Sequence, residues 1–124
     1  MDLPSKQKKI LIIDDEPQLR RSLFLILKYC NYLVTCAENA HEGLRLLREG
    51  EYDLLFLDVK LPDGNGLSLL PTVLQMHPSL PVILLTAHGE QSAASEALKM
   101  GARAYLLKPI DPEDILARVE ETLQ

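Results

Sequence analysis

The 124-residue sequence has few cysteines, no long apolar run and no excess of basic residues, and each absence excludes a class of protein. Cys30 and Cys36 have neither Cys-x-x-Cys spacing nor a histidine pair nearby, which argues against a zinc site. We interpret them as buried thiols in a reducing compartment, with an oxidised pair as the alternative, and His41 and His77 as surface residues. The longest early apolar run, residues 10–13, is too short for a signal peptide or a membrane span. We therefore expect a cytoplasmic protein that does not enter a membrane.

The charge balance is acidic, since 18 Asp and Glu residues against 13 Lys and Arg give a net charge of −5. This argues against direct nucleic-acid binding, which needs a basic face for the phosphate backbone. Hydrophobic residues make up 47% of the chain and charged residues 25%, which is typical of a globular domain and too apolar for disorder. The length fits one domain over residues 1–124, without repeats or linkers. Because a helical pattern still runs at Gln124, we expect either a small complete protein or the amino-terminal module of a longer one.

Short apolar runs alternate with segments of helical spacing. The runs, at residues 10–13, 32–36, 54–57, 82–85 and 104–107, are continuous, which is typical of strands buried on both faces of a parallel sheet. Helical patterns begin near Pro17, Asn39, Gly66, Glu90 and Asp111. Pro71 falls inside the third, where we expect a kink or a later helix start. With right-handed crossovers, this alternation predicts an α/β, doubly wound, flavodoxin-like (βα)5 fold with a five-stranded parallel sheet of order 2-1-3-4-5.

Polar side chains stand directly after four of the five runs. Asp14 and Asp15 follow the first run, Asp58 the third, Thr86 the fourth and Lys108 the fifth. Because the carboxyl ends of parallel strands share one edge, we expect these five residues to converge there. Taken singly, Asp14 or Asp15 could simply cap a helix. Together, the three carboxylates repel one another, since two unit negative charges about 4 Å apart repel by roughly 4 kcal/mol at an effective dielectric of about 20. One lysine leaves too little positive charge to balance them, and Mg²⁺ would supply the rest.

The motifs around these residues closely resemble the receiver domain of bacterial response regulators, the phosphoacceptor proteins of two-component signalling. The resemblance extends from about residue 8 to residue 123. It rests on order, spacing and strand-end placement together. The matching segments are Ile12-Ile13-Asp14-Asp15-Glu16, Leu57-Asp58-Val59-Lys60-Leu61-Pro62-Asp63-Gly64, Leu85-Thr86-Ala87 and Leu107-Lys108-Pro109.

This resemblance implies a phosphorylation site. Asp58 would accept a phosphoryl group from a phosphohistidine. Asp14, Asp15 and Asp58, with the backbone carbonyl of Lys60, would hold Mg²⁺, with Mn²⁺ as an alternative. Lys108 would pair with an acceptor or phosphoryl oxygen.

The resemblance also implies a switch. Thr86 and Ala87 would bind the phosphoryl group together with the lysine, and Tyr105 would turn inward as the threonine moves. The peptide bond before Pro109 would be cis. The predicted fourth helix offers mainly alanines to the core, so we expect phosphorylation to reshape the face made by helix 4, strand 5 and helix 5.

Function and partners follow from the same resemblance. Lys60 and His88 flank the site and would tune how fast water removes the phosphate. The partners would be a sensor histidine kinase or phosphotransfer protein, an output domain or protein partner in transcription regulation, and a second copy in a phosphorylation-dependent homodimer through helix 4, strand 5 and helix 5. The domain would be a signalling switch rather than an enzyme, catalysing only its own phosphorylation and dephosphorylation.

Three other functions fit less well. A Mg²⁺-dependent phosphohydrolase places two aspartates one residue apart after its first strand, nucleophile first, whereas Asp14 and Asp15 are adjacent here and Asp58 follows the third run. A nucleotide or flavin binder needs a glycine-rich phosphate loop after a strand, and Gly64-Asn65-Gly66 is better interpreted as a turn. A binding module that is never phosphorylated would not need all the polar strand-end residues.

Overall fold

The computed structural model describes residues 7–87 and 89–123. Its central sheet is five-stranded and parallel, in the order β2-β1-β3-β6-β7. The strands are β1 (Lys9–Ile13), β2 (Leu33–Ala37), β3 (Leu54–Asp58), β6 (Val82–Thr86) and β7 (Ala104–Leu107). Since β6 and β7 are the fourth and fifth strands of this sheet, the predicted order 2-1-3-4-5 is confirmed. A short antiparallel hairpin, β4 (Lys60–Leu61) with β5 (Gly64–Asn65), follows β3.

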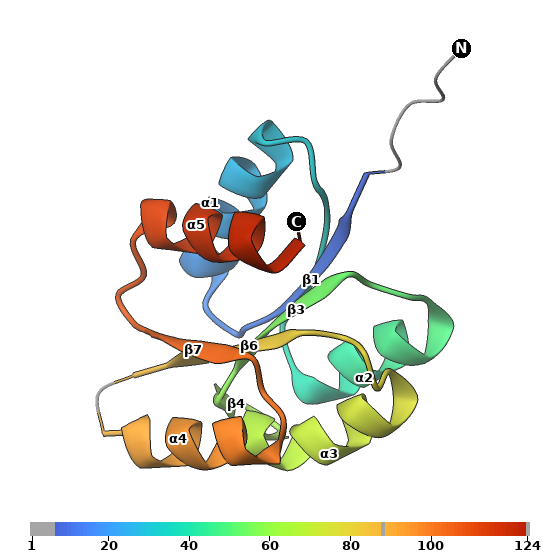
Figure 1. The fold of residues 1–124 in the computed structure, drawn as a ribbon, viewed down its shortest axis with the longest axis vertical. Coiled ribbons are helices and arrows are strands. Elements are labelled where there is room, and N and C mark those ends of the chain that lie inside the picture. Colours follow the sequence, from blue (N-terminus) through green and yellow to red (C-terminus); the bar gives the residue numbers. More distant parts are fainter. Residues whose placement is uncertain (1–6, 88, 124) are drawn as a thin grey trace.

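Helices cover both faces of the sheet (Figure 1). One face carries α1 (Pro17–Tyr29) and α5 (Pro112–Leu123), and the other carries α2 (Ala40–Glu49), α3 (Gly66–Met76) and α4 (Gln91–Met100). None of the helices in the described part of the chain is long and apolar enough to cross a membrane. The fold is therefore the doubly wound α/β arrangement that the alternating runs predict.

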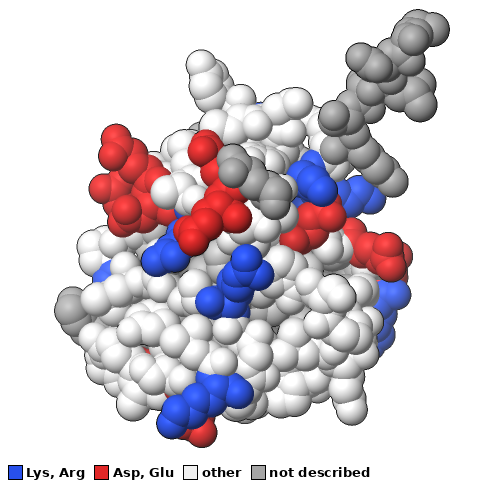
Figure 2. Space-filling view, in the orientation of Figure 1, with Lys and Arg blue, Asp and Glu red and all other residues white. Residues whose placement is uncertain are grey.

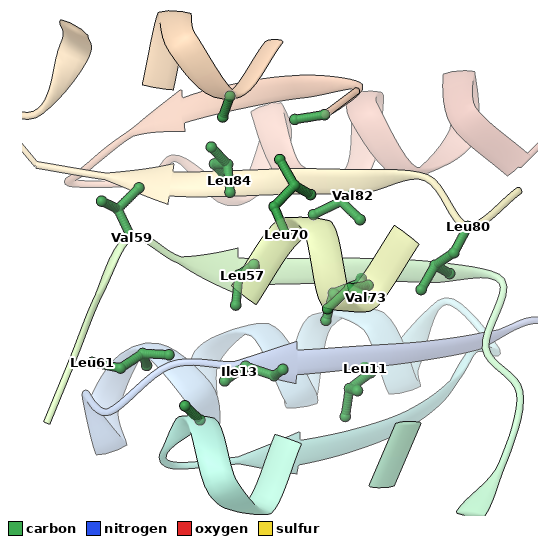
Figure 3. Close-up of a cluster of buried hydrophobic side chains, with 14 of the residues drawn as sticks. Leu11, Ile13, Leu57, Val59, Leu61, Leu70, Val73, Leu80, Val82 and Leu84 are labelled. Carbon is green, nitrogen blue, oxygen red and sulfur yellow. The ribbon is translucent and has the colours of Figure 1, made fainter. Parts of the chain in front are cut away.

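The strands are buried on both faces, which explains their continuous apolar runs. Ile10 and Ile12 belong to the core under α1 and α5, whereas Leu11 and Ile13 belong to the core under α2, α3 and α4. Figure 3 shows this second core, in which strand side chains face Leu70 and Val73 of α3. In β6 all five residues are buried, so the end of this strand is held firmly in the interior.

Local expectations for the third helix and the cysteines need comment. The helix begins at Gly66, as its pattern predicts, because Asn65 accepts the N–H of Leu67 at 2.8 Å; the alternative of a later start is wrong, and Pro71 lies inside the helix at an exposed position. Cys30 is exposed at the end of α1 rather than buried, and Cys36 is partly buried; both are free thiols. Burial raises the pKa of Cys36.

The histidines differ from each other. His41 is exposed, as expected, but His77 is half-buried, and its Nε2 lies 2.7 Å from the carbonyl oxygen of Leu47. The end of α3 packs against α2, which brings this ring onto the last turn of the neighbouring helix. His77 is thus a structural contact between two helices rather than a surface residue.

Candidate functional site: an acidic cleft at the sheet edge

The carboxyl ends of β1 and β3 bring three carboxylates together. Asp14 directly follows β1 and Asp58 is the last residue of β3, and the register pairs Ile13 with Leu57, so the two aspartates are neighbours across the sheet. Both are buried, whereas Asp15 is exposed. Oxygen atoms of all three lie within 4.8 Å of one another. The convergence expected from the strand ends is therefore present for these three carboxylates.

Lys108 reaches the same cluster from the end of β7. Its Nζ lies 2.7 Å from Oε1 of Glu16, 3.1 Å from Oδ2 of Asp14 and 3.3 Å from Oδ2 of Asp58. Its backbone N–H donates to the carbonyl oxygen of Thr86 at 2.6 Å, which ties the lysine to the neighbouring strand. The peptide bond that joins Lys108 to Pro109 is cis. The Lys108 ammonium group thus forms ion pairs with three carboxylates.

The electrostatics follow from burial and crowding. Burial, and then the charge of Asp14, raise the pKa of Asp58 to about 7, although Lys108 opposes the change. Burial also raises the pKa of Asp14, against the N–H of Glu16 and the lysine. Burial alone would lower the pKa of Lys108, but its carboxylate partners outweigh this and raise it. The cluster therefore has more negative charge than the lysine can balance.

A divalent metal ion fits this donor set. Asp14, Asp15 and Asp58 offer the hard oxygen ligands that Mg²⁺ prefers. Oδ2 of Asp14 is buried and, although close to Lys108, has no aligned hydrogen-bond partner in the described part of the chain. A buried oxygen of this kind is costly unless something pairs with it, and a cation would.

The cluster opens into a cleft of about 410 Å³. Its walls include Asp15, Asp58, Lys60, Ala87 and Glu90. The backbone N–H of Lys60 donates to Oδ1 of Asp58 at 3.2 Å, and the Lys60 side chain is exposed. The cleft is large enough for a small anion next to the buried carboxylate.

Some residues named from the sequence lie away from the cleft. Thr86 is fully buried, and its hydroxyl contacts the carbonyl oxygen of Ala87 at 3.3 Å rather than lining the cleft. Tyr105 is half-buried, pairs with Leu84 in the sheet and packs against the core under α2, α3 and α4. His88 lies outside the described residues.

Gly66 fixes the backbone behind Asp58. A Cβ at this position would lie 2.0 Å from the carbonyl oxygen of Asp58, and the N–H of Gly66 donates to the carbonyl oxygen of Val59 at 2.7 Å. The first residue of α3 therefore packs directly on the strand end that carries the buried aspartate. Only glycine allows this approach.

Three other residues make contacts in or near the site that the sequence pattern does not predict. Glu16 is the closest partner of the Lys108 ammonium, and its place beside the two aspartates was the only available signal. Asp63, in the β4–β5 loop, accepts the N–H groups of Ala40 and His41 at the start of α2. Glu90 accepts the N–H of Ala87 at 2.9 Å, and nothing in the sequence pattern marks this contact.

These features place the chain in the class of doubly wound α/β domains that carry an acidic site, here an aspartate cluster and a lysine, at the carboxyl edge of the sheet. Within this class, residues 10–120 match the family model of the response regulator receiver domain. The chain belongs to the response regulator receiver family.

Proteins of similar sequence support this family membership. The chain is 41% identical over 105 residues to the response regulator protein PilR of Pseudomonas aeruginosa, covering 85% of this chain and 24% of that protein. It is 34% identical over 119 residues to the transcriptional regulatory protein GlrR of Escherichia coli, covering 96% of this chain and 27% of that one. The chain spans a quarter to half of the length of such curated relatives.

Solved structures are similar throughout. A CheY-like receiver domain from Methanospirillum hungatei has a TM-score of 0.91 and 34% identity, over 95% of this chain and 94% of that one. A response regulator from Burkholderia pseudomallei, described with a phosphorylated aspartic acid, a calcium ion and citrate, has a TM-score of 0.83 and 32% identity, over 95% and 67%. These likenesses establish a two-component receiver domain with the CheY-like fold.

Proposed function

We propose that this domain is a phosphoacceptor switch whose acceptor is Asp58. The observation that carries the proposal is a buried carboxylate at the floor of a cleft, 3.3 Å from the ammonium of Lys108 and beside two further carboxylates. One oxygen of Asp58 would bond to phosphorus as the P–N bond to the imidazole of a kinase or phosphotransfer protein breaks, and the imidazole keeps the electron pair. Water would later attack phosphorus, restoring the carboxylate and releasing inorganic phosphate.

The cofactor proposed is Mg²⁺, or Mn²⁺, held by Asp14, Asp15, Asp58 and the backbone carbonyl of Lys60. When bound, the ion would neutralise charge on the transferring phosphoryl oxygens. Lys108 would pair with one of those oxygens, since its ammonium already lies at the acceptor carboxylate. The Burkholderia pseudomallei relative, with its phosphorylated aspartic acid and calcium ion, supports an acidic cation site beside an acceptor aspartate.

The switch proposed runs from Thr86 and the N–H of Ala87 to Tyr105 and α4. The hydroxyl of Thr86 would turn from the carbonyl of Ala87 toward the phosphoryl group, and Tyr105 would turn inward. The only fully buried side chains that α4 contributes are those of Ala94 and Ala97, so little buried apolar area opposes its movement. Lys60, on the wall of the cleft, is the residue proposed to tune the rate of phosphoryl loss. The same role for His88, which lies outside the described residues, stays a prediction.

The output surface proposed is the face formed by α4, β7 and α5. Figure 2 shows this face, with charged side chains gathered over α5, a broad uncharged area below them and further charged side chains at the lower edge, where α4 lies. Leu98, Met100 and Leu107 are exposed large apolar residues on α4 and β7, which suits contact with an output domain, a partner or a second copy.

The role in the cell proposed is control of transcription through an attached output domain or a partner. The named relatives are response regulators and transcriptional regulatory proteins several times or twice the length of the matched segment, and the acidic chain itself is unsuited to gripping DNA. The domain would act in the cytoplasm as a switch and not turn over external substrates.

The test is incubation with acetyl phosphate and Mg²⁺, followed by intact mass measurement. Wild type should gain one phosphoryl group, and Asp58→Ala none. Asp114→Ala, which removes an exposed carboxylate on α5, is the matched control and should gain one as wild type does. Phosphorylation of Asp58→Ala, or none in wild type, would refute the assignment.

A further inference from the structure

The loop between β6 and α4 is closed by two hydrogen bonds between Ala87 and Glu90. The N–H of Ala87 donates to Oε1 of Glu90 at 2.9 Å, and the N–H of Glu90 donates to the carbonyl oxygen of Ala87 at 3.1 Å. Glu90 is the N-cap residue of α4, yet its side chain caps none of the helix N–H groups. The carboxylate turns back onto the loop instead.

This loop forms one wall of the acidic cleft. Asp58 pairs with Leu85 in the sheet, and the N–H of Val59 donates to the carbonyl oxygen of Leu85 at 3.0 Å. Ala87 therefore follows two residues beyond the strand position beside the acceptor, and both Ala87 and Glu90 line the cleft. A backbone N–H suited to binding an anion is thus occupied by a carboxylate of the same chain.

We infer that Glu90 is an internal competitor of the phosphoryl group. Its carboxylate holds the N–H of Ala87 in the unphosphorylated domain, and a phosphoryl oxygen displaces it. This rests on the proposed function of Asp58. One N–H cannot serve two anions at full strength, and two anions this close repel each other. A group with a charge of about −2 on Asp58 therefore expels the singly charged Glu90.

Expulsion of Glu90 links the cleft to α4. It breaks one of the two hydrogen bonds that hold the start of the helix at Ala87, the one made by the Glu90 side chain. The N–H of Gly89 donates to the side chain of Gln91, the first residue of α4, and the φ of +90° at Gly89 suits a loop that can rearrange. Because the only side chains that α4 buries are those of two alanines, loss of this hydrogen bond shifts the position of the whole helix.

The experiment titrates beryllofluoride, a phosphoryl mimic, into the domain at saturating Mg²⁺ and measures its affinity by calorimetry. Glu90→Ala should bind the mimic at least fivefold more tightly than wild type. Glu90→Gln should lie between them, because its amide oxygen still accepts the N–H but has no charge. Glu96→Gln, with the same charge change at an exposed site on α4, is the matched control and should stay within twofold of wild type.

Two further readouts separate the explanations. Affinity for Mg²⁺ alone should not rise in either Glu90 variant, because both remove negative charge from the cleft. The amide proton of Ala87 should exchange faster in ligand-free Glu90→Ala than in wild type. An affinity of Glu90→Ala within twofold of wild type, or equal gains for Ala and Gln, would overturn the competition. Failure of wild type itself to bind the mimic, with every variant failing too, would instead refute the proposed function.

Discussion

Replacing Asp58 by Asn should stabilise the metal-free domain above neutral pH. The Asp58 side chain is only 5% exposed, and its pKa moves from 3.8 to about 7 on folding, because of burial first and the charge of Asp14 second. At 1.36 kcal/mol for each tenfold change in the dissociation constant, this amounts to roughly 4 kcal/mol of unfavourable ionisation at pH 8. Asn resembles the protonated acid and avoids that cost. Because the substitution also removes a partner of Lys108, we expect a net gain of about 2–4 kcal/mol.

The sign of the pH dependence follows from the raised pKa. Below pH 4 both the folded and the unfolded chain hold the Asp58 proton, so the substitution brings little. Between about pH 4 and pH 7 the unfolded chain loses this proton while the folded chain keeps it, so wild-type stability falls relative to the variant as pH rises. Above pH 7 the difference levels off. Burial raises the pKa of Asp14 too, so a smaller slope of the same sign remains in the variant.

Urea unfolding in the presence of a chelator, at pH 4, 5.5 and 8, measures the effect. Glu51→Gln removes an exposed carboxylate at the opposite edge of the sheet and serves as the control, with a change below about 0.5 kcal/mol. Excess Mg²⁺ should then largely cancel this difference, since an ion at 100 times its dissociation constant stabilises wild type by about 2.7 kcal/mol and the variant lacks a ligand. A metal-free Asn variant no more stable than wild type at pH 8 would refute the reasoning about the buried charge.

Three substitutions test how the cleft is supported. Gly66→Ala should cost more than about 3 kcal/mol in urea unfolding, because its Cβ would meet the backbone of Asp58, which cannot move cheaply; a loss below 1 kcal/mol would contradict this. Gly43→Ala should cost about 1–2 kcal/mol, because its Cβ would meet the end of the Ile13 side chain, and Ile13→Val should recover part of that loss in the double variant. Asp63→Ala should cost about 1–2 kcal/mol by leaving two N–H groups at the start of α2 unpaired, with Asp63→Asn losing less.

The central sheet could be predicted because its signals are local and continuous. Strands buried on both faces need no alternation, and helix ends were marked by residues such as Asn39, whose side chain accepts the N–H of Glu42 at 2.8 Å, and Gly101, which ends α4 in a left-handed conformation. The edge strand β2 was predicted one residue early. The N–H of Tyr32 donates to the carbonyl oxygen of Leu27, so Tyr32 belongs to the end of α1, and an apolar run alone cannot separate the two.

The cleft was predictable only as far as backbone register decides it. Asp14, Asp58 and Lys108 follow strands whose order fixes their convergence, so their positions are a consequence of topology. The roles of Glu16 and Glu90 depend instead on where flexible side chains point. Glu16 lies 92 residues from its lysine partner, and no pattern within the chain announces such a pair.

These side-chain contacts have one feature in common in the unphosphorylated cleft: carboxylates already occupy the groups proposed to bind the phosphoryl oxygens. The two groups proposed to receive phosphoryl oxygens, the ammonium of Lys108 and the N–H of Ala87, each have a carboxylate as their shortest side-chain partner, at 2.7 Å from Glu16 and 2.9 Å from Glu90. Asp58 is the most distant of the three carboxylates that the Lys108 ammonium contacts, at 3.3 Å, so the acceptor shares this ammonium with Asp14 and Glu16. A singly charged anion entering the cleft would exchange one such contact for another of equal charge and gain little. A doubly charged phosphoryl group beside a divalent ion gains at every exchange, so the surplus of negative charge in the cleft favours the one kind of ligand that can outcompete it.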